Sequence, residues 1–195
     1  MTATARKLPH PMTVEEFFAW DGSGHVGKLE LVDGMVRAQS YASGGHATIQ
    51  GNISGLLRSH LRANPPGCRV GTEAGVIPRL DPSRNVRKPD VSVTCTPHSK
   101  GERSFPDPIL IVEVLSPSIA AEKWESIWAC ATIPSLAEIV VIASDRMHAD
   151  VFCRDAKGFW PDPGVVVSAG GIVQLPALGL DMPMEEIYWN VVLGA

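Results

Sequence analysis

The run from Ile109 to Leu115 is apolar at every position except Glu113. Its leucine and β-branched residues predict a strand that is buried on both faces, as in a sheet covered by helices. An ionised carboxylate in such a strand is costly unless a partner offsets its charge. Two partners fit this position: a metal ion shared with a second carboxylate, or an ion pair with an arginine. The first alternative makes the surroundings of Glu113 a candidate functional site, whereas the second is purely structural.

A second carboxylate, Asp90, follows Pro89 at the start of another apolar stretch. A predicted turn over residues 81–85 precedes it, so Asp90 is expected to open a strand over residues 89–95. Two carboxylates on neighbouring strands suit a hard divalent cation such as Mg²⁺ or Mn²⁺. Such an ion lowers the pKa of bound water and stabilises charge on a phosphoryl oxygen. The pair therefore points to metal-dependent chemistry on a phosphoryl group.

The composition is that of one globular domain. The 195 residues are 45% hydrophobic and 19% charged, and the longest apolar runs fall far short of the roughly 18 residues that a membrane span needs. We expect a flexible tail over residues 1–11, which lacks the apolar core of a secretory signal, and a single domain over residues 12–195. A cytoplasmic location is expected. The net charge of −4 argues against a protein that coats nucleic acid, although local basic patches can still serve a site.

The cysteines give a prediction about the redox environment. The four are widely separated and form no CxxC pair: Cys68, Cys95, Cys130 and Cys153. This spacing argues against a zinc site. Cysteines among apolar neighbours are typical of buried free thiols in a reducing cytosol.

The periodicity along the chain indicates alternating strands and helices. Thr13 and Glu16 form a capping box that predicts a short helix, and Asp33-Gly34 predicts a hairpin turn between strands over residues 28–32 and 35–38. The remaining predicted elements are helices over residues 44–63, 119–131 and 183–191 and strands over residues 68–80, 89–95, 109–115, 138–143, 148–154, 163–168 and 172–175. Mixed strands with interleaved helices predict an α/β or α+β fold in which helices pack against a sheet.

Several motifs in order resemble a known family. Pro89-Asp90, followed by Glu113-Val-Leu115, resembles the PD-(D/E)xK nuclease signature. The segments Leu29-Glu-Leu-Val-Asp-Gly34, Lys88-Pro-Asp-Val91, Glu113-Val-Leu-Ser-Pro-Ser118 and Ile133-Pro-Ser-Leu-Ala-Glu138, together with His46, resemble the bacterial Uma-two family of endonucleases. The resemblance covers residues 12 to 190. It implies a restriction-endonuclease-like fold with a central mixed β-sheet flanked by helices, metal ligation by Asp90 and Glu113, and Mg²⁺-dependent or Mn²⁺-dependent hydrolysis of DNA.

The chain departs from the signature at one position, because Leu115 stands where the tripeptide has a lysine. In the family this lysine often lies on the following helix, which makes Lys123 the candidate. A solvated helix residue is the alternative for Lys123. Lys88 is a second candidate, although the alternation of strand side chains directs it away from Asp90.

Further acids and bases could complete the site. Glu73, before the Asp90 strand, is a candidate third metal ligand, with a solvent-exposed glutamate as the alternative. Glu30 or His46 could reach the metal from the far side, and His46 could instead carry a proton near neutral pH or simply bond to the backbone at the helix start. Arg87 and Lys88 are candidate phosphate-binding residues.

These observations leave three functions open. The first is a metal-dependent DNA endonuclease. A homodimer is compatible with it, because cutting both strands of a duplex needs two sites, although no residue pattern indicates one. The second is a nuclease-fold protein that has lost catalysis and acts in binding or assembly, which the Leu115 position and the acidic net charge favour. The third is a structural or interaction protein in which Asp90 and Glu113 pair with arginines.

Overall fold

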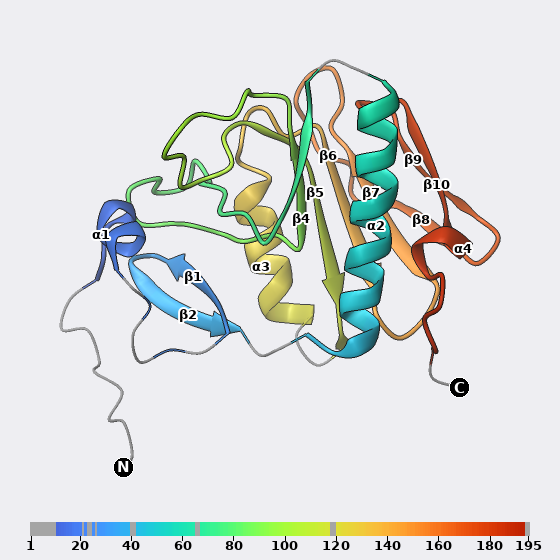
Figure 1. Ribbon diagram of the computed structural model, residues 1–195, viewed down its shortest axis with the longest axis horizontal. Coiled ribbons are helices and arrows are strands. Elements are labelled where there is room, and N and C mark those ends of the chain that lie inside the picture. Colours follow the sequence, from blue (N-terminus) through green and yellow to red (C-terminus); the bar gives the residue numbers. More distant parts are fainter. Residues whose placement is uncertain are drawn as a thin grey trace, which may run out of the picture.

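A six-stranded mixed sheet forms the centre of the computed structural model, which describes residues 11–20, 22, 25, 27–39, 42–64, 67–117 and 120–193. The strand order is β3-β4-β5-β6-β7-β8 (Figure 1). The strands span Arg69–Thr72 (β3), Val91–Thr94 (β4), Pro108–Leu115 (β5), Glu138–Ala143 (β6), His148–Cys153 (β7) and Val165–Ser168 (β8). Strands β5 and β6 run parallel, and the other neighbours are antiparallel.

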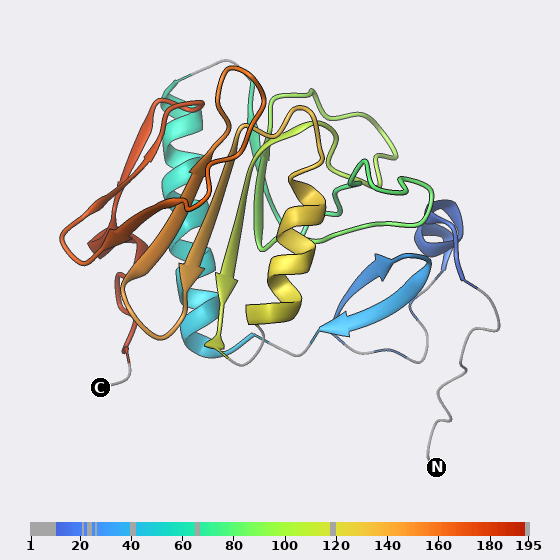
Figure 2. The same ribbon diagram turned by 180° about the vertical axis from the view of Figure 1, so that it is seen from behind.

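Two helices cover opposite faces of this sheet, α2 (Gly44–Ala63) and α3 (Ala120–Cys130), as the two opposite views show (Figures 1 and 2). Alternation along β5 assigns its side chains to these two faces, because successive strand residues point to opposite sides. Val112 and Val114 pack with the core of α2, whereas Ile111 and Leu115 pack with the core of α3. Glu113 shares the parity of Ile111 and Leu115, so the strand presents its carboxylate to the α3 side.

A hairpin of β1 (Lys28–Val32) and β2 (Met35–Gln39) lies beside the sheet, next to the short helix α1 (Val14–Ala19) (Figure 1). The predicted capping box at Thr13 and the hairpin turn are both confirmed. Asp33 and Gly34 have φ values of 51° and 82°, and a two-residue turn with both φ angles positive matches the twist of a hairpin. Leu31 forms a bridge to Val86 and joins a small apolar cluster with α1, which fixes the hairpin to the segment that leads into β4.

A second hairpin closes the other end of the molecule. It consists of β9 (Ile172–Leu175) and β10 (Leu180–Pro183), followed by the single turn α4 (Met184–Ile187). Val173, Leu175 and Met182 are buried with the core that lies under α2. The sequence did not predict β10, and the helix predicted over residues 183–191 is limited to one turn.

Two other expectations are corrected. The strand predicted over residues 68–80 ends at Thr72, because Glu73 has a φ of 51° that breaks the extended path. Cys68 and Cys95 form a disulfide, so the prediction of free thiols is wrong for this pair and holds for Cys130 and Cys153. Cys68 and Cys95 are adjacent to Arg69 and Thr94, which pair with each other, so the register of the two strands brings the cysteines opposite each other.

Within the described ranges, no helix is long and apolar enough to cross a membrane.

Candidate active site

Two buried carboxylates from neighbouring strands form the centre of the site. Val91 of β4 pairs with Val112 of β5, and one further step in this antiparallel register sets Asp90 opposite Glu113. Each residue has only 2% of its surface exposed. The backbone N–H of Val114 donates to Asp90 Oδ2 at 2.8 Å, which holds the aspartate against β5 although it precedes β4. The register of two strands thus brings together acids that lie far apart in the sequence.

Lys123 supplies a cation to Glu113 from the covering helix α3. Its Nζ donates to Glu113 Oε2 at 2.9 Å, and both side chains are at least nine-tenths buried. Helical periodicity places Lys123 on the same face as Ile127 and Cys130, which pack against β5 and its neighbours. The alternative of a solvated helix lysine is therefore wrong for the position of Lys123. Glu113 has a lysine as its partner, not the arginine that a purely structural ion pair led us to consider.

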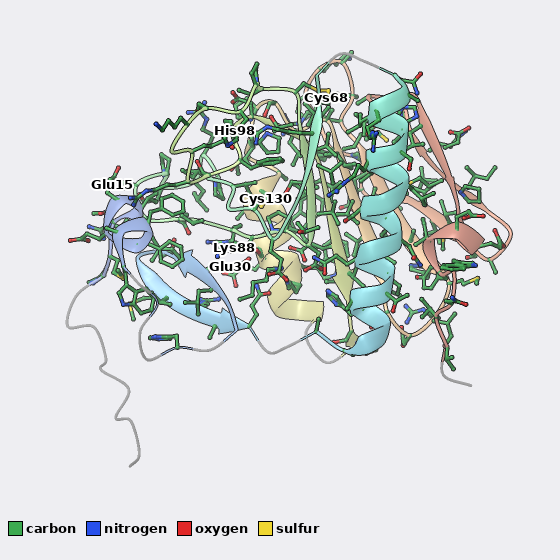
Figure 3. All side chains as sticks on the ribbon, viewed as in Figure 1. Glu15, Glu30, Cys68, Lys88, His98 and Cys130 are labelled. Atoms are coloured by element: carbon green, nitrogen blue, oxygen red, sulfur yellow. A yellow bond between two sulfur atoms is a disulfide. The ribbon has the colours of Figure 1, made fainter. Side chains whose placement is uncertain are left out.

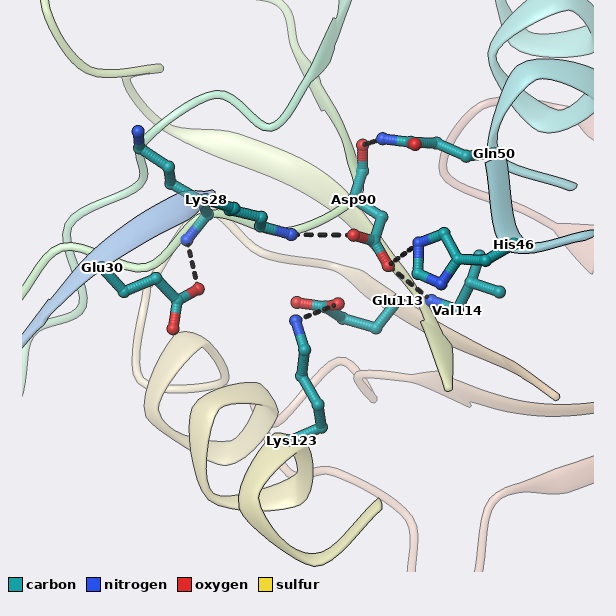
Figure 4. Close-up of polar contacts among 9 residues, drawn as sticks. Lys28, Glu30, His46, Gln50, Asp90, Glu113, Val114 and Lys123 are labelled. Atoms are coloured by element: carbon teal, nitrogen blue, oxygen red, sulfur yellow. Dashed lines mark hydrogen bonds and ion pairs between the residues drawn. The ribbon is translucent and has the colours of Figure 1, made fainter. Parts of the chain in front are cut away.

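Asp90 is contacted from two sides by basic groups (Figure 4). Lys28, at the start of β1, donates from Nζ to Asp90 Oδ1 at 2.7 Å. His46, in the first turn of α2, places Nε2 3.3 Å from Asp90 Oδ2. The hydroxyl of Ser43 caps this helix by accepting the N–H of His46, so the cap fixes the backbone of the histidine. Gln50, one turn further along α2, donates to the backbone carbonyl of Asp90 at 2.8 Å.

These surroundings separate the two acids electrostatically. Burial raises the pKa of Asp90, but the hydrogen bond from His46 and the charges of Lys28 and Lys123 outweigh it, so this pKa lies well below its usual value. Burial and the nearby charge of Asp90 raise the pKa of Glu113, and the charges of Lys123 and Lys28 offset only part of this effect. Burial lowers the pKa of Lys28, but the charges of Glu113 and Asp90 reverse this and raise it. Asp90 is therefore the permanent anion, and Glu113 is the acid that responds to its surroundings.

Asp90 and Lys123, the partner of Glu113, line a cavity of about 1040 Å³ between the β1–β2 hairpin, α2 and α3, and Glu113 lies behind this lining. The side chains that line it include five cations: Lys28, Arg37, Arg87, Lys88 and Lys123. Arg37 and Glu125 bridge the hairpin and α3 at 3.8 Å, with both side chains largely exposed to solvent. The lining also holds four carboxylates, Glu30, Glu73, Asp90 and Glu125, so an anionic substrate is attracted mainly where a cation such as Lys88 has no acidic partner among the described residues.

The predicted phosphate-binding residues occupy different positions in this cavity. Arg87 is buried, with 4% of its surface exposed, and donates from NH1 to the carbonyl of Leu31 at 2.6 Å, so part of its guanidinium holds the hairpin. Lys88 also contributes to the lining of the cavity, and the expectation that its side chain points away from Asp90 stays a prediction. Their contact with phosphate stays a prediction.

The remaining candidate acids are Glu30 and Glu73. Glu30 is buried and accepts the backbone N–H of Lys88 at 2.8 Å, which joins β1 to the segment before Asp90 (Figures 3 and 4). Glu73 lines the cavity but is exposed, and only its backbone N–H reaches the Asp90 carbonyl.

The donor set favours a hard ion that keeps most of its water. Among the described residues, no three His, Cys, Asp or Glu side chains are grouped closely enough to hold a metal ion, so Glu73 does not join Asp90 and Glu113 in a ready-made cluster. Mg²⁺ needs no such cluster, since one or two carboxylates plus waters and substrate phosphate are its usual ligands. Asp90 and Glu113 fit this requirement.

Sequence patterns carry no signal for two of the residues around Asp90. Lys28 is the first residue of a hairpin strand that is unremarkable apart from its turn, and Gln50 is a polar residue within a long helix. Both become neighbours of Asp90 only through tertiary packing. Lys28 could have been placed at the site from the sequence only if the pairing of the hairpin with residues near 86 had been known.

Comparisons with known proteins agree with this architecture. Residues 14–185 match the sequence profile of a family named Uma2, described as "Putative restriction endonuclease". An uncharacterised protein of Synechocystis sp. is 28% identical over 193 residues, which are 96% of this chain and 97% of that protein. A crystal structure from Anabaena variabilis, described as "a putative nuclease belonging to DUF820", superposes with a TM-score of 0.71 at 17% identity and covers 91% of this chain and 98% of that one. The predicted restriction-endonuclease-like fold is confirmed.

Proposed function

The chain belongs to the Uma2 family, and from this premise we propose that it is a nuclease that uses a divalent metal ion, Mg²⁺ or Mn²⁺, to hydrolyse phosphodiester bonds of DNA. One observation carries the proposal beyond the family. Asp90, Glu113 and Lys123 come from two strands and a helix, and they meet in a buried cluster at the edge of a cation-lined cavity. This is the arrangement that the PD-(D/E)xK signature requires, with the lysine supplied by the helix.

Asp90 and Glu113 would hold the metal ion. The ion, when bound, activates water for attack and neutralises charge on the phosphoryl group. Lys123 has its ammonium group at Glu113, where it orients the attacking water or stabilises the negative charge that develops on the phosphate oxygens. His46 lies on the far side of Asp90 and can fix that carboxylate or carry a proton.

The cavity wall provides the contacts that a nucleic-acid backbone needs. Lys88 makes no ion pair in the described part of the chain and lines the cavity, so its charge is available to a phosphate. Because phosphate contacts carry little sequence information, they account for affinity and leave the target sequence open. A DNA substrate is the proposal for this cavity, and RNA is its competitor in the test below.

The decisive experiment is a cleavage assay with matched variants. Purified protein is incubated with supercoiled plasmid, single-stranded DNA and RNA, each with EDTA, Mg²⁺ or Mn²⁺. Asp90→Asn and Glu113→Gln should each abolish cleavage, whereas Asp181→Asn, an exposed acid on β10, should leave it unchanged. Cleavage that persists equally in Asp90→Asn would indicate a contaminating nuclease and end the proposal, and cleavage of RNA alone would correct its substrate.

A binding protein without catalysis is the second candidate, and the position of Leu115 is the observation that favours it. It predicts retention of labelled DNA with no cleavage under any metal condition. The proposed homodimer is tested in the same plasmid assay together with a molar-mass measurement. A dimer with two sites should produce linear plasmid early, and a monomer should accumulate nicked circles first.

A further inference from the structure

The ammonium group of Lys28 lies in the place where a cation would be expected. It is 2.7 Å from Asp90 Oδ1, and the two side chains are 8% and 3% exposed. Figure 4 shows the lysine extending from β1 across the site toward Asp90, on the side where Glu113 also lies. The negative charges of Glu113, Asp90 and Glu30 all act on this ammonium group. A single lysine thus partly neutralises the acids of the site from within.

Lys28 differs from Lys123 in what it contacts and where it comes from. Lys123 is bonded to Glu113 from the rigid covering helix, whereas Lys28 is bonded to Asp90 from the first residue of a hairpin strand. The hairpin belongs to a separate small cluster, and several contacts hold its backbone, among them the Leu31 bridge, the bond from Arg87 to the Leu31 carbonyl and the contact between Glu30 and Lys88. None of these contacts uses the ammonium group of Lys28, so this side chain can withdraw from Asp90 without disturbing the sheet or α3.

We propose that Lys28 competes with the divalent ion for Asp90, so that its ammonium group offsets the charge of Asp90 in the metal-free site and must leave before the ion can bind. Asp90 Oδ2 is already engaged by His46 and by the N–H of Val114, so Oδ1 is the oxygen that faces away from β5 and α2. Lys28 occupies that oxygen. An ion bound at Oδ1 and a buried ammonium group within contact of the same atom would repel each other strongly.

This inference rests on the metal site of the proposed function but concerns a different property, the affinity for the ion. It predicts that removal of the ammonium group tightens metal binding, which is the opposite of what a ligand or a structural support would do. It also predicts that metal binding releases β1 from Asp90, so occupancy of the site and the position of the hairpin are linked.

The test measures Mn²⁺ binding to EDTA-stripped protein from the spectrum of free Mn²⁺, with Mg²⁺ as a competitor and no nucleic acid present. Lys28→Met should bind Mn²⁺ roughly tenfold or more tightly than the unmodified protein. Lys88→Met removes the same charge from the wall of the same cavity but touches neither acid, and its affinity should change by less than about threefold. The double variant with Lys28→Met and Asp90→Asn should not show the tighter Mn²⁺ binding.

Unchanged or weaker Mn²⁺ binding in Lys28→Met would overturn the inference. An equal gain in Mn²⁺ affinity in Lys88→Met would overturn it as well, because it would indicate only the general electrostatic effect of removing a positive charge from the cavity. A gain that survives Asp90→Asn would place the ion elsewhere and overturn it as well. Lys28→Gln keeps an N–H donor for Asp90 without the charge and serves as the second variant if Lys28→Met is poorly folded. In either variant, Mn²⁺ should raise the melting temperature more than in the unmodified protein.

The outcome is independent of catalysis. Tighter binding in Lys28→Met by a protein that cleaves nothing would leave this inference standing and remove the proposed nuclease function. Cleavage with unaltered metal affinity in Lys28→Met would remove the inference alone.

Discussion

At the scale of single residues, the protonation of Glu113 controls how the metal-free protein responds to pH. Burial and the charge of Asp90 raise the pKa of Glu113 to about 8 from an ordinary value of 4.5. The folded state therefore binds a proton that the unfolded state has released between these two values, and the free energy of unfolding should fall as pH rises from about 5 to 8. Asp90 acts in the opposite direction and only at acid pH, because its pKa is lowered and its stabilisation is lost below its ordinary value.

Denaturant unfolding in EDTA at pH 5 to 8 checks this prediction. In Glu113→Gln the free energy of unfolding should depend less on pH in this window, since the titrating group is gone. Asp181→Asn, which alters an exposed acid, should leave the pH dependence unchanged. A slope that is the same in Glu113→Gln would assign the pH response to another group.

Lys123 is the residue whose replacement should cost most activity with the fold intact. Lys123→Met removes the ammonium group at Glu113, and loss of one such stabilising group typically lowers turnover by about 10²- to 10³-fold. Loss of the Lys123 charge favours the protonated form of Glu113 further, so no bare charge is left buried and the fold should persist. Lys123→Arg should recover part of the rate.

Steady-state cleavage kinetics and near-ultraviolet circular dichroism separate these effects. Lys157→Met replaces an exposed lysine after β7 and should match the unmodified protein in both measurements. Wild-type turnover in Lys123→Met would show that this lysine only supports the structure.

The residues of the site could be predicted to very different degrees. Asp90 and Glu113 were found because each interrupts or opens an apolar strand, and a charge in such a place is conspicuous in sequence. Lys123 followed only from resemblance to a family in which the lysine lies on the helix. Lys28 was missed because nothing near it in sequence is unusual, and its importance arises from contact with Asp90.

At the scale of elements, the disulfide between Cys68 and Cys95 ties the edge strand β3 to β4. The two cysteines are separated by 27 residues, for which loop-closure entropy predicts a stabilisation of about 3 to 4 kcal/mol. Cys68→Ser combined with Cys95→Ser should lower the melting temperature, and dithiothreitol should lower that of the unmodified protein to a similar value. The double variant should not respond to dithiothreitol. A Cys130→Ser control keeps the disulfide and should still respond.

Elements with a strong local signal were predicted well. The helix Gly44–Ala63 and the strand Glu138–Ala143 have the predicted bounds, because each combines clear periodicity with a turn or proline at its end. The strand over residues 68–80 was overextended, since Glu73 adopts a left-handed backbone conformation that nothing in its neighbours indicates. The disulfide depends on strand register, which the positions of the cysteines do not reveal.

At the scale of the whole molecule, an acidic protein carries a cavity with a small local excess of cations. The net charge is −4, whereas five cations and four carboxylates line the cavity. DNA binding should therefore be weak at physiological salt and confined to the cavity. In a salt titration followed by fluorescence anisotropy in EDTA, Lys88→Met should lower the slope of log affinity against log salt by about one. Lys157→Met should leave the slope unchanged, and an equal loss in both would indicate binding over the general surface.

The direction of β4 determines where the chain can be divided without separating the acids from their strands. Asp90 directly precedes this strand and Glu113 lies near the end of β5, so the connection over residues 95–107 turns at the opposite end of the sheet from the acids. Most of that connection is exposed, and Gly101 lies at its tip with open space around it. New termini placed at Gly101 would leave both acids on intact, paired strands. Two separately produced fragments that meet there could rebuild the site by strand pairing alone, which would make this fold a scaffold for a nuclease assembled on demand.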